Sequence, residues 1–294
     1  MTRPYRFEWL DVFTRTPLEG NQLAVFPNAH GLSADEMLRI ARETHLSETT
    51  FVFPREADRD RVEGYPTRIF ATFGEMPFAG HPTLGTAFVL ADRTGADDIG
   101  LKLPVGRIPV TFRTTDGARF GEMQQNEPEF GSTHEVPALA RALGVEPDDL
   151  DRSVPAQTVS TGIPFGIVPF RSLETLQTLR PAWSQLDDYL RGTDAKFLYL
   201  ITRQAVDASA GLHARMIFAG GDDPATGSAA GPAAAWMVRH GWARPDATVL
   251  IEQGLEAHRR SHLFVAAGVQ DGRPTRVRVG GYCVRSIAGE LELP

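Results

Sequence analysis

Cysteine is almost missing from this chain, which has only Cys283 among its 294 residues. A single thiol excludes a disulfide within the chain and a cysteine-rich metal site. It also excludes any reaction that needs two thiols from one chain.

Positive charge and long apolar runs are scarce as well. The chain has 30 Lys and Arg against 37 Asp and Glu, a formal net charge of −7, and no basic stripe of the kind that binds nucleic acid. It has no apolar run of about 18 residues, the length that a membrane-spanning helix needs. The segment after Met1 has no apolar signal core. We therefore expect a cytoplasmic protein that binds neither nucleic acid nor a membrane.

Two familiar site types lack a residue that they require. Gly80 and Gly85 have the spacing of a phosphate loop, but the lysine that should precede Thr86 is absent. His258 and His262 stand four residues apart, but no glutamate adjoins His258 and the segment runs into a predicted strand. We therefore expect neither a nucleotide site nor a metal site.

Two stretches of the chain share one pattern, Gly80–Ala87 (GHPTLGTA) and Asp223–Gly231 (DPATGSAAG). Each places a polar residue and a proline ahead of small residues and an apolar run. Proline is favoured in the first turn of a helix, and small residues leave the first backbone N–H groups open to an anion. The pattern predicts two helices that begin near Pro82 and Pro224 and face one cleft.

Strand and helix patterns alternate along the rest of the chain. Ser33-Ala34-Asp35-Glu36 has the form of a capping box, and it predicts a helix that ends near His45. Further helices are predicted at 136–143 and 181–190, and strands at 5–13, 22–26, 49–53, 61–72, 101–103, 108–113, 120–124, 197–201, 212–218, 248–252, 263–267 and 275–284. The polar segment 125–135 is the best candidate for a linker.

The two halves of the chain correspond at a constant offset. Gly162 follows Gly20 by 142 residues, and Gly227 follows Gly85 by the same number (162 − 20 and 227 − 85). At this offset Pro224 aligns with Pro82 and Asp223 with His81. We predict an α+β fold of two pseudo-symmetric domains, 1–126 and 127–294, each a mostly antiparallel sheet wrapped around a central apolar helix. The active site is expected in the cleft between them.

Three polar residues are candidates for chemistry, and each has a simpler explanation. Glu48 precedes an apolar strand, where partial burial would raise its pKa and suit a general acid/base, or it is an ordinary loop glutamate. His81 at a helix start is expected to be neutral and to contact a substrate, or it only caps its helix. Asp223 is a preferred N-cap residue and needs no ligand to explain it. Ser228 lacks the surroundings of an activated nucleophile.

Several motifs together resemble the phenazine-biosynthesis isomerase family, the PhzF-like proteins. They are Gly20-Asn21, Leu46–Phe51 (LSETTF), Met76–Thr83 (MPFAGHPT), Asp223–Ser228 (DPATGS) and Glu252-Gln253-Gly254. They span essentially the whole chain in the family's order. The resemblance implies a diaminopimelate-epimerase-like fold, no cofactor and usually a homodimer. Gln22 and Asp222 depart from the family pattern, which commonly has proline and glutamate there.

The resemblance also implies a reaction and a set of roles. The family's general acid/base glutamate falls on Glu48, and its substrate-binding side chains fall on His81, Asp223 and Ser228. Gly80 and Gly227 match the glycines whose N–H groups face the substrate carboxylate. The expected function is cofactor-independent proton transfer on a small cyclic amino or hydroxy carboxylate, as in trans-2,3-dihydro-3-hydroxyanthranilate isomerase.

Two alternatives stay open beside this reading. The first is an epimerase or racemase of the same fold, although the two-thiol version is excluded because His81 and Asp223 occupy the expected thiol positions. The second is a small-molecule-binding protein that keeps the fold without catalysis.

Overall fold

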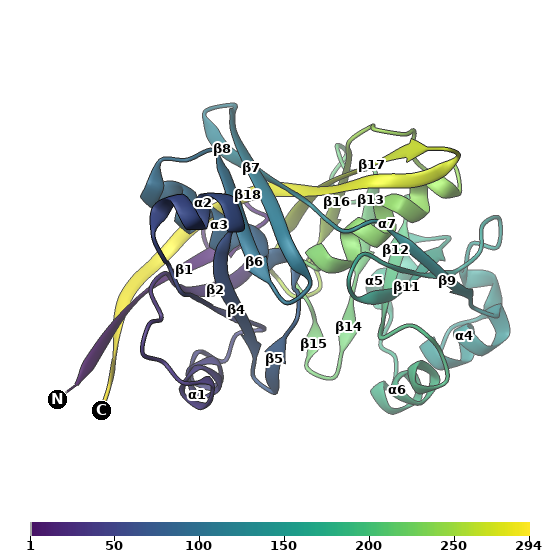
Figure 1. The fold of residues 1–294 in the computed structure, drawn as a ribbon. Coiled ribbons are helices and arrows are strands. Elements are labelled where there is room, and N and C mark those ends of the chain that lie inside the picture. The colour runs from purple at the N-terminus through teal and green to yellow at the C-terminus, as the bar shows by residue number, and fades with distance from the viewer. Residues whose placement is uncertain (1) are drawn as a thin grey trace. The chain divides into compact units, whose positions relative to one another are not determined.

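The structure, a computed structural model, describes residues 2–294 and divides the chain into two compact units. Unit 1 consists of residues 1–124 and 280–294, and unit 2 of residues 125–279. This differs from the predicted domains at the C-terminus. The last strand, β18 (Arg273–Leu293), enters unit 1 and pairs antiparallel with β1 (Arg3–Val12), so the chain's two ends complete one sheet (Figure 1).

Unit 1 is a mixed sheet in the order β1-β2-β3-β4-β6-β7-β8, with β5 added beside β4. Two neighbouring pairs, β2–β3 and β4–β6, are parallel, and the other described pairs are antiparallel. The strands are β2 (Asn21–Phe26), β3 (Thr49–Val52), β4 (Tyr65–Ala71), β5 (Gly74–Met76), β6 (Asp98–Leu103), β7 (Gly106–Thr115) and β8 (Ala118–Gln124), and the helices are α1 (Ala34–Thr44), α2 (Ala57–Glu63) and α3 (Gly80–Thr94).

The helices of unit 1 follow from different causes. In α1 the Ser33–Glu36 capping box forms as predicted, and the helix ends at His45 in the left-handed conformation, with φ 53°. In α3 every residue from Gly80 to Ala87 is buried, which confirms the predicted interior helix.

Helix α2 was not predicted, because its charged sequence has no apolar period. The ion pairs of Arg55 with Asp60 and Glu63, at 2.8 and 2.6 Å, stabilise it.

Unit 2 repeats this arrangement with strands in the order β9-β10-β11-β12-β13-β16-β17-β18. The pairs β11–β12 and β13–β16 are parallel, and the other described pairs are antiparallel. The strands are β9 (Glu129–Thr133), β10 (Gln157–Ser160), β11 (Pro164–Phe170), β12 (Phe197–Thr202), β13 (Leu212–Arg215), β16 (Val249–Gln253) and β17 (Ser261–Gln270), with a separate hairpin of β14 (Ile217–Phe218) and β15 (Gly221–Asp222). The helices are α4 (Val136–Leu143), a 3₁₀ turn (Pro147–Asp149), α5 (Leu173–Thr178), α6 (Trp183–Arg191) and α7 (Gly227–Arg239).

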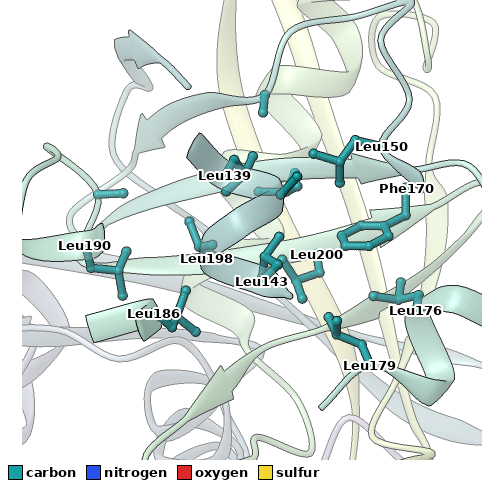
Figure 2. Packing of buried hydrophobic residues seen from close by; sticks show 14 residues of the cluster. Leu139, Leu143, Leu150, Phe170, Leu176, Leu179, Leu186, Leu190, Leu198 and Leu200 are labelled. Carbon is teal, nitrogen blue, oxygen red and sulfur yellow. The ribbon is translucent and has the colours of Figure 1, made fainter. Parts of the chain in front are cut away.

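Two layers of apolar side chains hold unit 2 together. On one side of the sheet, Leu139 and Leu143 of α4 pack with Leu198 and Leu200 of β12, and Leu186 of α6 extends the same cluster (Figure 2). Helix α7 is buried from Gly227 to Met237 and forms the apolar centre of the unit, as α3 does in unit 1. The prediction of one central apolar helix in each domain is thus confirmed.

The internal repeat is confirmed, but its offset at the central helix is wrong. In both units, successive strands pair in the order antiparallel, parallel, antiparallel, parallel. The central helix directly precedes the last strand of this series along the chain. Helix α3 begins at Gly80 and α7 at Gly227, so the helix starts are 147 residues apart (227 − 80) and not 142. His81 therefore corresponds by position to Ser228, because each is the second residue of its helix.

The predicted linker 125–135 also proves to be structured. Residues Glu129–Thr133 form β9, which pairs with β10, and Gln125 is buried with 4% exposure. Strand β9 lies at the edge of the sheet and is largely exposed, and of the segment only Gln125 and His134 are buried, so its polar composition reflects an exposure to solvent that a linker would share.

Candidate active site

Glu48 lies in unit 1 on the short connection between α1 and β3. The chain turns sharply out of α1 at His45 and enters β3 at Thr49, which leaves Glu48 immediately before a fully buried strand. Its side chain is 17% exposed. The sequence-based expectation of a partly buried carboxylate at this position is confirmed.

His81 is the second residue of α3 and is 4% exposed. Its Nδ1 lies 3.2 Å from the amide nitrogen of Asn21, the first residue of β2. Burial lowers the pKa of the imidazole to about 3, and a hydrogen bond with the backbone of Gln22 opposes this shift only in part. His81 is therefore neutral at physiological pH, as the sequence predicted, although burial and not the helix dipole is the main cause.

The structure brings Glu48 and His81 together. Nε2 of His81 lies 3.5 Å from Oε2 of Glu48. The amide nitrogen of Asn21 can donate to Nδ1 only in the tautomer that carries the ring proton on Nε2, and in that tautomer the proton faces the carboxylate. A movement of a few tenths of an ångström would turn this contact into a hydrogen bond, and catalytic hydrogen bonds often tighten in this way when substrate binds.

Two contacts tie α3 to the strands that carry its partners. Asn21 of β2 contacts His81, and the hydroxyl of Thr86 donates to that of Thr50 in β3 at 2.8 Å. Because Glu48 directly precedes β3, the second contact fixes the distance between Glu48 and the start of α3.

Gly80 and Gly227 are the first residues of α3 and α7, and their N–H groups belong to the first turns, which have no intrahelical acceptor. The predicted starts at Pro82 and Pro224 are therefore corrected. Helix α3 begins two residues before its proline, and α7 begins three residues after its own.

Asp223 is not the N-cap of α7, because Thr226 holds that position. The Asp223 side chain is 9% exposed, and its Oδ2 accepts a hydrogen bond from the Thr226 hydroxyl at 2.6 Å. Its N–H donates to the carbonyl of Met216 at 2.9 Å. Asp223 thus belongs to a folded loop before the helix, and for this reason the prediction of an N-cap residue from local preference was wrong.

Ser228 is the second residue of α7 and is 9% exposed. Asp223, Ser228 and Gly227 lie close together along one short segment of unit 2, whereas Glu48, His81 and Gly80 belong to unit 1. Each unit therefore carries a helix start with buried polar side chains beside it.

Two further residues shape the start of α7 and were not singled out as site residues. Gln253 is fully buried at the end of β16 and bonds to Asp223 and Thr226. Gln125 donates to the carbonyl of Gly227 at 2.8 Å and accepts from Thr161 at 2.6 Å. The only sequence signal for either was the Glu252-Gln253-Gly254 motif.

Glycine is required at Gly231 for Gln125 to lie across α7, because a Cβ there would stand 1.9 Å from Oε1 of Gln125. Gly254 is required for two reasons. Its φ is +84°, and a Cβ would stand 2.4 Å from the carbonyl oxygen of Pro224.

Residues 2–294 contain no group of three or more His, Cys, Asp or Glu side chains that could hold a metal ion. His258 lies in a turn, and His262 pairs with Asp207 at 3.1 Å, so the two histidines do not form the helical pair that binds metal. In the same described range, no helix combines the length and the apolar character needed to cross a bilayer.

Comparison with known proteins gives consistent matches over the whole chain. A family model described as phenazine biosynthesis-like protein (PhzC-PhzF) matches residues 10–289. An "uncharacterized isomerase" of Mesorhizobium japonicum is 36% identical over 297 residues, covering 96% of both chains. The trans-2,3-dihydro-3-hydroxyanthranilate isomerase of Pseudomonas chlororaphis is 34% identical over 293 residues, covering 97% of this chain and 98% of its own.

Solved structures show the same fold. A PhzF-family protein of Bacillus anthracis superposes with a TM-score of 0.87 at 26% identity and covers 99% of both chains. A hydroxyproline epimerase of Agrobacterium vitis has a TM-score of 0.64 at 11% identity, with 99% of this chain and 93% of that chain covered. The second match concerns the fold alone, and it places the chain among two-domain, diaminopimelate-epimerase-like folds.

Proposed function

Because the chain belongs to the phenazine biosynthesis-like (PhzC-PhzF) family and is an isomerase of that family, we propose that it moves a proton by general acid/base catalysis. The proposed acid/base is Glu48. It takes a proton from a carbon next to an unsaturated system and returns it at another carbon of the same molecule, so no redox partner or cofactor enters the balance.

One observation carries this proposal, the contact of Glu48 with a neutral histidine. His81 offers a hydrogen-bonding nitrogen 3.5 Å from Oε2 of Glu48, and its pKa of about 3 keeps it from becoming an imidazolium. A neutral donor orients the carboxylate and leaves its negative charge in place, whereas an imidazolium would neutralise that charge. Glu48 thus stays available to accept and release a proton while its position is fixed.

We propose that the buried polar groups of unit 2 serve the same substrate. Asp223 and Ser228 would bind its amino or hydroxyl groups, and the N–H groups of Gly80 and Gly227 would bind its carboxylate. These roles, and the homodimer that the family resemblance implies, stay predictions. The proposed substrate class is a small cyclic amino or hydroxy carboxylate, the class to which trans-2,3-dihydro-3-hydroxyanthranilate belongs.

Thiol-based epimerisation does not fit this chain. Such chemistry needs two thiols, and Cys283 is the single cysteine. It is buried in β18, and burial raises the pKa of its thiol far above the ordinary value, so a reactive thiolate does not form there.

Glu48→Gln tests the assignment. We expect the variant to lose roughly 10²- to 10⁴-fold in turnover, the usual contribution of a general acid/base, and to keep its affinity for the substrate. Glu43→Gln, on the exposed face of α1, is the matched control and should keep wild-type turnover. Near-normal turnover in Glu48→Gln would remove Glu48 from the mechanism.

Deuterium exchange separates the remaining alternatives. The wild-type protein is incubated in D₂O with a panel of cyclic amino carboxylates, and exchange and isomer composition are followed by NMR. Exchange with net isomerisation supports the proposal. Exchange without isomerisation supports an epimerase-like enzyme, and binding without exchange a non-catalytic binding protein.

A further inference from the structure

Gln253 lies at the centre of a hydrogen-bond chain that leads to Asp223. It is fully buried, and its Oε1 accepts from the backbone N–H of Thr226 at 3.1 Å and from the hydroxyl of Tyr199 at 2.9 Å. Because a backbone N–H can only donate, the amide atom that faces it must be the oxygen. The orientation of the Gln253 side chain is therefore determined.

The orientation of Gln253 fixes the direction of the next bonds. Its Nε2 donates one hydrogen to the carbonyl of Asp223 at 2.8 Å and the other to the hydroxyl oxygen of Thr226 at 2.9 Å. The Thr226 hydroxyl has one hydrogen of its own, and it lies 2.6 Å from Oδ2 of Asp223. Since the Gln253 amide is a donor, the Thr226 hydroxyl must donate to Asp223.

The chain of bonds determines what Asp223 can do. A proton on Oδ2 would meet the hydroxyl hydrogen of Thr226 between two oxygens 2.6 Å apart, so Oδ2 has to act as an acceptor. Asp223 and Thr226 are 9% and 4% exposed, which limits competition from water. The arrangement fixes Oδ2 of Asp223 as a hydrogen-bond acceptor.

We propose that Gln253 and Thr226 are positioning residues that keep Asp223 a hydrogen-bond acceptor, so that this part of the site selects ligands that carry an amino or hydroxyl hydrogen beside their carboxylate. The inference rests on the proposed function in one respect, the placement of Asp223 at the substrate. Thr226 makes no side-chain cap bond to α7, so its hydroxyl serves Asp223 and Gln253 and not the helix.

Binding of matched ligands tests the inference. 2-Aminobenzoate and benzoate share a ring and a carboxylate and differ only in the amine, so the ratio of their affinities reports the contact with an acceptor. We expect the wild-type protein to prefer 2-aminobenzoate by about tenfold or more in calorimetric titrations, since a hydrogen bond to a charged group contributes at least that much. 2-Hydroxybenzoate should also bind more tightly than benzoate, because its hydroxyl group can donate to the same acceptor.

Thr226→Val removes the hydroxyl and nearly keeps the shape, and we expect it to reduce the preference to about twofold. Thr226→Ser keeps the hydroxyl but loses the methyl group, and it should keep the preference for the amine. If Thr226 served only to pack the loop, the presence of the hydroxyl would not decide this preference. Thr202→Val is the matched control. Thr202 is 1% exposed, and its hydroxyl oxygen faces the N–H of Gln204, outside the chain of bonds to Asp223.

A second variant keeps the test decisive if Thr226→Val does not fold. Gln253→Met removes the donor to Thr226 and frees the hydroxyl to turn away, so the preference should fall between the wild-type and twofold values. Equal wild-type affinity for the two ligands, no measurable wild-type binding, or an undiminished preference in Thr226→Val would each overturn the inference.

These results are independent of turnover. If Glu48→Gln stays active while the wild-type protein still prefers the amine, the acid/base proposal fails and the positioning role of Gln253 and Thr226 stands. If Glu48→Gln is inactive and the amine has no effect on binding, the reverse holds.

Discussion

Gly85 of α3 lies directly against Leu23 of β2. A Cβ at position 85 would stand 2.6 Å from Cδ2 of Leu23 and 2.8 Å from Cγ2 of Val12. The missing side chain lets the helix approach the strand closely, and the same approach brings His81 to 3.2 Å from Asn21 at the start of β2. Packing in the core of unit 1 thus sets the position of a candidate site residue.

Gly85→Ala should therefore destabilise unit 1 by about 1–3 kcal/mol, the usual effect of overpacking, despite the better helix propensity of alanine. Turnover should fall as well, because the helix start moves relative to Asn21. Urea unfolding measures the first effect. Adding Leu23→Val, which shortens the contacting side chain, should recover part of the stability, whereas additive losses in the double variant would show that Leu23 is not the obstacle.

The neutral state of His81 predicts a specific dependence on pH. Its pKa is about 3 in the folded protein and about 6.5 in an unfolded chain, so the folded state binds fewer protons between these values. The free energy of unfolding should therefore fall as the pH drops below about 6.5, with a contribution from His81 of at most about 1.4 kcal/mol per pH unit. His81→Gln should flatten this part of the curve.

Imidazole nitrogen shifts measured by NMR offer a direct check. The His81 ring should keep the shifts of a neutral tautomer down to about pH 4, because its pKa is about 3. Titration of His81 near 6.5 would contradict the proposed role of a neutral donor.

His213 in unit 2 should have the opposite dependence. Its Nδ1 and Nε2 lie 2.9 and 3.0 Å from carboxylate oxygens of Glu252 and Glu256. Burial alone would lower the pKa of His213, but these two hydrogen bonds outweigh it and raise the pKa above the ordinary value. The histidine gains a proton on folding, so its stabilisation is complete below about pH 6.5 and is lost as the pH rises through the folded pKa.

The two glutamates contribute in the other direction. Burial would raise their pKa values, but the bonds to His213 and other donors lower them, so their stabilisation is lost as the pH falls below about 4.5. His213→Gln should thus lower the free energy of unfolding most between about pH 4.5 and 6.5, by on the order of 3–5 kcal/mol, and by less at pH 9. Thermal unfolding of the variant beside His258→Gln measures this, and a cost independent of pH would show that His213 is uncharged.

Local patterns in the sequence were sufficient for much of the fold. The capping box at Ser33, the apolar run after Gly80 and the helix Val136–Leu143 were all predicted, because hydrogen bonds and side chains a few residues apart determine such elements. The internal repeat was visible as well, since each copy needs its own close-packed central helix.

Other features depend on residues far apart in the chain. The C-terminal strand leaves unit 2 because its partner is β1, more than 270 positions away. The start of α7 lies three residues after Pro224, because Gln253 and Thr226 fold the preceding loop around Asp223. No periodicity or cap preference contains this information.

The sequence by itself determined the two-unit α+β repeat and the family resemblance, and it predicted Glu48, His81, Asp223 and Ser228 as candidate site residues. The tertiary structure decided that Glu48 and His81 are in contact, that His81 is neutral because it is buried, and that Asp223 is bound by Thr226 and does not cap the helix. The physical reason is that residue types limit which chemistry is available, whereas distance, burial and the direction of a hydrogen bond depend on packing between distant segments.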